Sequence, residues 1–119
     1  MISDELVGVF KKEVKRLLKL YGLSSWEVNV ETCRLHDDTT ALVAPIYKAR
    51  YATIMIDADH EESEASVKKS AMHEVLHLLF SDMREAYREQ EGAEDTERAA
   101  SAEHGVIHAL VNAEYGDDE

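Results

Sequence analysis

Several features that are common in other protein classes are scarce in this sequence of 119 residues. A single cysteine, Cys33, excludes an internal disulfide framework and suits a reducing compartment. One proline and five glycines exclude a collagen-like or linker-dominated chain. No apolar run approaches the roughly 20 residues that a membrane span needs. Residues 1–5 contain neither a basic nor an apolar stretch, so we expect no signal peptide, no membrane contact and a cytoplasmic protein.

Basic residues are also few. The chain has 13 Lys and Arg against 25 Asp and Glu, which gives a formal net charge of −12. The excess of acid lies toward the C-terminus, where residues 82–119 hold 12 acidic and 3 basic residues. Such a chain is repelled by the phosphates of nucleic acids and by anionic membranes, so we expect no nucleic-acid partner. The acidic surface either serves solubility or attracts a basic protein partner.

Hydrophobic residues make up 45% of the sequence, which is enough for one buried core in a chain of this length. We therefore predict a single domain over residues 1–119, with an acidic tail at about 114–119. Apolar residues that recur at helical spacing predict three helices. The first is expected at residues 4–20, and the third from near Thr96 to before Gly116. The second is expected from residue 63 or 66 to Phe80, and residues 82–90 either continue this helix or form a short helix of their own.

Three segments between the first and second predicted helices have the pattern of strands. Residues 26–32 alternate between apolar and polar side chains, and residues 39–48 are rich in Thr, Val, Ile and Tyr, with an interruption expected at Pro45. Residues 50–57 form the third predicted strand. The fold class is therefore predicted as α+β, with an N-terminal helix, a small curved sheet of about three strands and two further helices.

The first predicted helix has a basic face in this acidic chain. We expect that face to be solvated or paired with the acidic C-terminal part, and the net charge argues against a role in binding nucleic acid. The face consists of Lys11, Lys12, Lys15, Arg16 and Lys19.

The most informative segment reads His73-Glu74-Val75-Leu76-His77, which is an H-E-x-x-H pattern within a predicted helix. Residues four apart project from one helix face, so His73 and His77 can reach the same metal ion. Imidazole nitrogen is a good zinc ligand. Glu74 lies beside them, close enough to take a proton from a water molecule on the metal. The segment therefore predicts a catalytic Zn²⁺ site.

A catalytic zinc site usually has three protein ligands and one open position. One class of such sites continues as H-E-x-x-H-x-x-G-x-x-H, but here Phe80 occupies the Gly position and Met83 the last His position. The third ligand must come from elsewhere, and the last predicted helix is the most plausible source. That helix offers Glu97, Glu103, His104 and His108.

Among these, Glu103 is our first expectation for the third ligand. It lies in an apolar row with Val106 and Leu110, and an ionisable group among apolar neighbours is costly unless it is paired or bound to metal. His104 is the alternative, because it lies in a similar row and forms an i, i+4 pair with His108. Glu97 is in the first helical turn, where an acid favours the helix dipole without any further role.

A hydrolase also needs a group that polarises the transition state. His108, Tyr87 and Tyr115 are candidates, and the sequence does not choose among them. His36 and His60 are expected to be loop residues.

At this point the chain resembles a zincin metallopeptidase of the minimal single-domain kind found in bacteria and their phages. The likeness is carried by the residues around the H-E-x-x-H pattern, and more loosely by residues 23–28, 52–56 and 102–107. It implies a catalytic helix packed on a curved sheet, zinc held by His73, His77 and a downstream ligand, and Glu74 as the general base. In zincins an edge strand commonly lies along the cleft and pairs with an extended peptide, and residues 50–56 would match that strand.

Two functions follow as hypotheses. The first is a zinc-dependent peptide-bond hydrolase acting on a peptide or protein substrate, with a metal-bound water activated by Glu74. The second is a binding protein of zincin-like fold, in which zinc is structural or vestigial and the acidic surface captures a basic protein partner. A domain with no metal at all is a third reading, which the position of Glu74 between the two histidines argues against.

Overall fold

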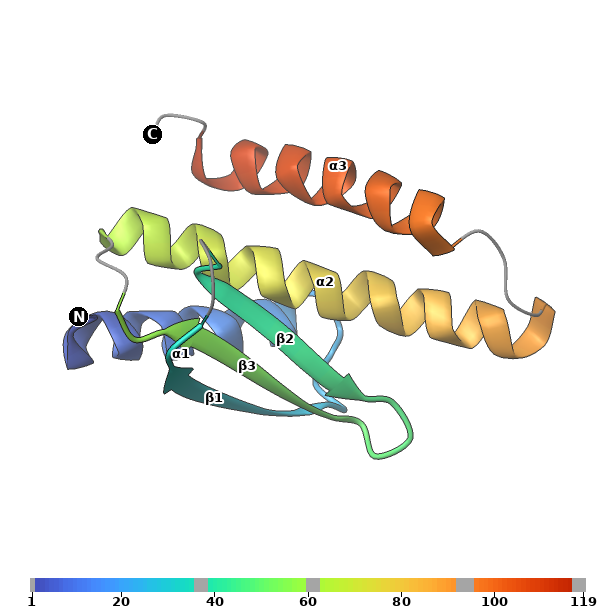
Figure 1. Ribbon diagram of the computed structural model, residues 1–119, viewed down its shortest axis with the longest axis horizontal. Coiled ribbons are helices and arrows are strands. Elements are labelled where there is room, and N and C mark those ends of the chain that lie inside the picture. The colour runs from blue at the N-terminus through green and yellow to red at the C-terminus, as the bar shows by residue number, and fades with distance from the viewer. Residues whose placement is uncertain (1, 36–38, 60–62, 92–95, 117–119) are drawn as a thin grey trace.

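A computed structural model of the chain describes residues 2–35, 39–59, 63–91 and 96–116, without the side chains of 87–91 and 96–101. The protein is an α+β domain of three helices and a three-stranded sheet, which confirms the layout predicted from the sequence (Figure 1). In chain order the elements are α1 (Asp4–Leu20), β1 (Glu27–Cys33), β2 (Ala41–Ile46), β3 (Tyr51–Asp57), α2 (Glu64–Glu91) and α3 (Thr96–Tyr115).

The strands are ordered β1-β3-β2, so the last strand in the sequence lies at the centre of the sheet. β3 runs parallel to β1 and antiparallel to β2. Its side chains Ala52, Ile54 and Ile56 are fully buried, as is typical of a central strand. The expectation that residues 50–56 form the edge strand of a cleft is therefore wrong, because both edges of β3 are paired. The edge strand on the side of α2 is β2, as the contacts between these two elements indicate.

β2 continues through Pro45 instead of stopping there. The backbone N–H of Asp57 donates to the carbonyl of Thr40 at 2.8 Å, which sets the alternation of hydrogen bonds along the β2–β3 ladder. In that alternation Ala41, Val43 and Pro45 turn their backbone groups away from β3, toward the edge of β2 that is open in the described part of the chain. A proline is tolerated at such a position because the missing N–H removes no ladder hydrogen bond.

The turn between β2 and β3 is tied to α2 by Arg50, a non-glycine residue with a positive φ of 54°. Its guanidinium donates to both carboxylate oxygens of Asp82, at 3.1 and 3.0 Å, and to the Ser25 hydroxyl at 2.8 Å. The same group lies 4.9 Å from the ring centroid of Trp26. These contacts hold the end of β2 beside α2.

The core lies between one face of the sheet and the two helices α1 and α2 (Figure 1). α2 is continuous through residue 91, so residues 82–90 extend the predicted second helix. Phe10 and Leu17 of α1, Ile54 of β3 and Leu76 of α2 are all fully buried in this core. Among the described residues, no helix is both long enough and apolar enough to cross a membrane.

α3 packs on α2 and adds Ile107 and Val111 to the hydrophobic core (Figure 1). It buries Glu103, Ile107 and Val111, whereas Val106 and Leu110 remain 48% and 38% exposed. The apolar row expected around Glu103 therefore faces solvent in part. The reason is that α3 packs mainly on α2 and reaches α1 only near its C-terminal end, through Tyr115 and Glu13, so a narrow stripe of its surface is buried.

Candidate metal centre

Two histidines one turn apart on α2 form the base of the site. The Nε2 atoms of His73 and His77 are 3.1 Å apart, and their ring centroids are 4.7 Å apart. Two ligands of a tetrahedral zinc ion are separated by roughly 3.3 Å, given metal–nitrogen bonds of about 2.0–2.1 Å. The two imidazoles that the sequence placed on one helix face are thus already at a separation that suits a shared metal.

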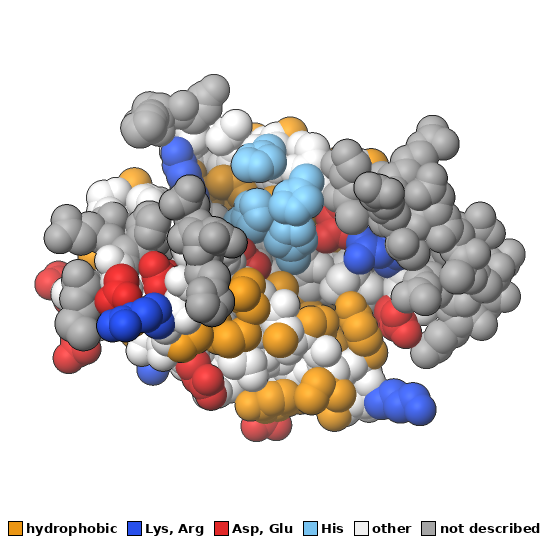
Figure 2. Space-filling view, viewed as in Figure 1, with side chains coloured by type: hydrophobic (Ala, Val, Ile, Leu, Met, Phe, Trp, Pro, Cys, Tyr) orange, Lys and Arg blue, Asp and Glu red, His pale blue; other side chains and the backbone are white. Residues whose placement is uncertain are grey.

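α3 adds a third histidine to this pair. The ring centroid of His104 lies 4.7 Å from that of His77 and 5.7 Å from that of His73. One ligand atom from each of these three residues lies within 4.8 Å of the others, and together they form the metal-compatible group found among the described residues. The histidines gather at one place on the molecular surface (Figure 2). Three imidazoles with one remaining open position have the donor chemistry of a catalytic zinc site.

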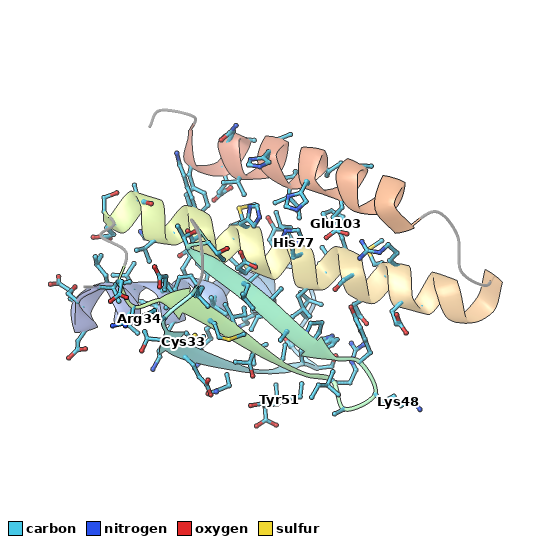
Figure 3. The ribbon with its side chains drawn as sticks, viewed as in Figure 1. Cys33, Arg34, Lys48, Tyr51, His77 and Glu103 are labelled. Carbon is cyan, nitrogen blue, oxygen red and sulfur yellow. The ribbon has the colours of Figure 1, made fainter. Side chains whose placement is uncertain are left out.

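Glu103 of α3 contacts His77 on the ring nitrogen that points away from His73 (Figure 3). Its carboxylate is buried, accepts a hydrogen bond from Nδ1 of His77 at 2.7 Å and pairs with the guanidinium of Arg84. A carboxylate can only accept here, so Nδ1 of His77 carries the proton, and Nε2 of the neutral ring is the acceptor that faces Nε2 of His73. Glu103 is therefore positioned to orient His77, whereas His104 completes the group of three neighbouring ligand atoms. The choice between Glu103 and His104 as the third ligand stays a prediction.

The different positions of these two residues predict different losses of metal affinity. We expect Glu103→Gln to weaken zinc binding by about 10- to 100-fold, as is typical for removal of a carboxylate that orients a ligand. We expect His104→Ala to weaken it further, because a ligand is lost. Competition with a chromogenic chelator measures both affinities. A larger loss for Glu103→Gln than for His104→Ala would contradict this assignment and would favour Glu103 as the ligand.

Burial shifts the pKa values of His73 and Glu74, the first two residues of the H-E-x-x-H motif. Burial first, and then the neighbouring histidines, lower the pKa of His73 to about 4, which keeps its lone pair available at neutral pH. Glu74 is only 6% exposed, and this burial raises its pKa to about 7. A carboxyl group with a pKa near neutrality is suited to act as a general base.

The raised pKa of Glu74 predicts a pH-dependent difference in stability between the wild type and Glu74→Gln, both without metal. The folded-state pKa of about 7 lies above the unfolded value of 4.5, so the contribution of Glu74 to stability is complete below pH 4.5 and is lost as the pH rises through 7. Relative to wild type, Glu74→Gln should gain about 3 kcal/mol between pH 4.5 and pH 8.

Urea unfolding in the presence of a chelator, at several pH values in this range, measures this difference. The opposite contribution of His73 is common to both proteins and cancels. A difference in unfolding free energy that does not change with pH would show that Glu74 ionises as it does in the unfolded chain.

A groove of about 380 Å³ runs between the open edge of β2 and the histidines. One side is formed by residues of β2 and the following turn, including Val43, Pro45 and Tyr47. The other side is formed by His73, Glu74 and residues of α2 and α3. Any chain bound along β2 would therefore pass directly beside the histidines.

The candidates for a polarising group are separated by the fold. The ring of His108 lies 5.6 Å from that of His73, and His108 lines a second groove together with Glu74. Tyr115 instead donates a hydrogen bond to Glu13 of α1. The side chains of Tyr87 and Glu97, and the residues His36 and His60, lie outside the described part of the chain. Among the described candidates, His108 is the one beside the motif.

Sequence reasoning missed Arg84, which pairs with Glu103. Arg84 and His77 project from the same face of α2, because they are seven positions apart, which is nearly two helical turns. That spacing is a signal that the sequence contained. It gains meaning only when Glu103 of α3 is known to lie opposite.

Comparisons with known proteins do not name a family for this chain. No protein-family model matches it, and neither the curated proteins nor the solved structures gave a match.

Proposed function

We propose that this protein is a zinc-dependent peptide-bond hydrolase with a zincin-like arrangement of its catalytic helix. The observation that carries the proposal is the convergence of His73, His77 and His104 beside the buried carboxyl group of Glu74. A zinc ion, when bound, would lower the pKa of a water ligand to about 7 and polarise a carbonyl oxygen.

In this proposal His73, His77 and His104 hold the metal. The low pKa of His73 keeps its imidazole neutral, and Nε2 of His77 lies 3.1 Å from Nε2 of His73 while its Nδ1 contacts Glu103, which supports this assignment. Glu103 then acts through His77 as a positioning residue, with its charge balanced by Arg84.

Glu74 would accept a proton from the attacking water and pass it to the nitrogen of the leaving amine. Both transfers require a group that is readily protonated and deprotonated near neutral pH, which the raised pKa of Glu74 supports. Of the candidates named from the sequence, His108 is the described side chain beside His73, and it would donate a hydrogen bond to a developing oxyanion.

The open edge of β2 suggests how a substrate would be held. The backbone groups of Ala41 and Val43 face away from β3 and are available for pairing with an extended peptide, whereas Pro45 offers only its carbonyl. Pairing of this kind recognises the backbone and requires an extended segment. The substrate class is therefore an unfolded or extended part of a peptide or protein.

Zinc titration of metal-free protein tests the proposal. An unfolded, fluorescently labelled casein substrate should be cleaved at a rate that rises with added zinc up to one equivalent per chain. A chelator should abolish the cleavage, and renewed zinc should restore it. Stoichiometric zinc binding without any cleavage of casein or of a peptide library would instead favour a binding protein with a structural zinc.

A further inference from the structure

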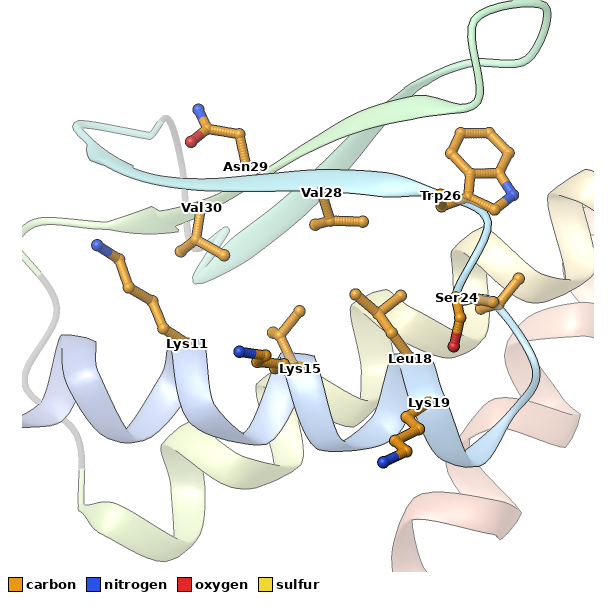
Figure 4. A pocket seen from close by; sticks show the side chains of 11 residues that line it. Lys11, Lys15, Leu18, Lys19, Ser24, Trp26, Val28, Asn29 and Val30 are labelled. Atoms are coloured by element: carbon orange, nitrogen blue, oxygen red, sulfur yellow. The ribbon is translucent and has the colours of Figure 1, made fainter.

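A third groove, of about 550 Å³, lies on the other edge of the sheet between α1 and β1 (Figure 4). It shares no lining residue with the groove beside the histidines. Its floor is apolar and is formed by Val14 and Leu18 of α1 together with Val28 and Val30 of β1. The groove is larger than the one at the candidate metal centre, and the proposed hydrolase does not use it.

The helix side of this groove is basic. Lys11, Lys15 and Lys19 recur every four residues along α1 and all line the groove. No carboxylate among the described residues forms an ion pair with any of the three. In α1 the residue whose guanidinium reaches the acidic C-terminal part is Arg16, which lies 3.9 Å from Glu114. In a chain with a net charge of −12, three cations thus line one apolar groove without an ion-pair partner in the described part of the chain.

The strand side of the groove has free backbone groups. The N–H of Glu27 donates to the carbonyl of Arg50 at 2.8 Å, and the carbonyl of Cys33 accepts from the N–H of Ala58 at 2.9 Å. These contacts show that alternate residues of β1 face β3, so Val28 and Val30 turn their N–H and C=O groups toward the outer edge. Within the described part of the chain, β1 pairs with β3 alone.

We propose that this groove binds an extended acidic segment of a partner protein, which pairs as an added strand with the free edge of β1. The spacing of the two sides supports this occupant. Lysines four residues apart on a helix are about 6 Å apart along its axis. Side chains on one face of an extended strand repeat at about 6.7 Å. Acidic side chains at alternate positions can therefore meet successive lysines.

The same features favour a peptide over an anionic lipid chain. A fatty acid has one carboxylate and no backbone, so it would leave two of the lysines and the free groups of Val28 and Val30 without partners. An extended peptide with acidic side chains at three alternate positions can satisfy both. The inference does not depend on the proposed hydrolase.

Fluorescence anisotropy with a labelled synthetic peptide tests the proposal. The probe carries Glu at three successive alternate positions, with Thr between them to favour an extended strand. We expect the combined substitution Lys11→Glu, Lys15→Glu and Lys19→Glu to weaken binding at least ten-fold. The matched control is Lys12→Glu, since this exposed lysine of the same helix does not line the groove. Circular dichroism establishes that both variants are folded.

A second peptide separates strand pairing from simple charge attraction. It has the same side chains but N-methyl groups on the amides that would face β1, and we expect it to bind at least ten-fold more weakly. Equal affinity of the two peptides, or equal affinity of the triple variant and the Lys12→Glu control, would overturn the proposal. So would displacement of the probe by dodecanoate at lower concentration than by unlabelled peptide, which would indicate an anionic amphiphile.

Two further measurements test whether the groove binds a second copy of this chain and whether peptide binding is independent of the candidate metal centre. Sedimentation velocity that finds a concentration-dependent dimer, lost in the triple variant, would assign the groove to a second copy of this chain and overturn the acidic-partner proposal. Glu74→Gln should bind the probe with unchanged affinity, so that failure of the proposed hydrolase and failure of this proposal remain distinguishable.

Discussion

Glu74→Gln is expected to retain zinc and fold and to lose peptide hydrolysis by about 100- to 10,000-fold, the range typical of a missing general base. Gln has nearly the same shape as Glu, so the packing of α2 against β2 is preserved. It cannot accept the proton of the attacking water. The effect should appear in kcat, because the substituted group acts in the chemical step and the β2 edge that holds the substrate is unchanged.

The measurement is a progress curve on the labelled casein substrate with zinc at one equivalent. The matched control is Glu64→Gln, which removes an exposed carboxylate from the first turn of the same helix, where it pairs with Lys68 at 3.5 Å. That control should keep full activity. Activity of Glu74→Gln equal to that of the control would refute the proposed role of Glu74.

The second large effect is expected for His73→Ala, which should remove the metal. Protein purified without added metal should contain about one zinc per chain, and the variant should contain almost none. His73 is the residue around which the site is built: the rings of His77, His104 and His108 all have their centroids within 5.7 Å of its own. Loss of this ligand leaves two imidazoles, which is fewer than a catalytic zinc site normally has.

Elemental analysis by mass spectrometry measures the metal content of both proteins. His108→Ala is the matched control, because His108 lies beside His73 but outside the group of three ligand atoms, and it should keep the zinc. Equal zinc content in the wild type and His73→Ala would place the metal elsewhere. No zinc in either protein, even after zinc is offered, would remove the basis of the proposed hydrolase.

The sequence by itself determined the features that depend only on residues close together in the chain. The N-terminal helix was predicted at residues 4–20 and is observed at Asp4–Leu20, with Ser3 accepting a hydrogen bond from the N–H of Leu6 as its cap. The pairing of His73 with His77 was equally accessible, because four residues of helix return a side chain to the same face. Both depend on a periodicity within one segment.

The tertiary structure decided everything that depends on how separate segments meet. Glu103 and His104 are neighbours in sequence and point about 100° apart around α3, so only the rotation of α3 against α2 determines how each of them lies toward His73 and His77. The order of the strands, which puts β3 at the centre and β2 beside the histidines, is a pairing between distant segments. A helical or alternating pattern specifies which residues share a face, but the partner that covers that face is chosen by packing of the whole chain.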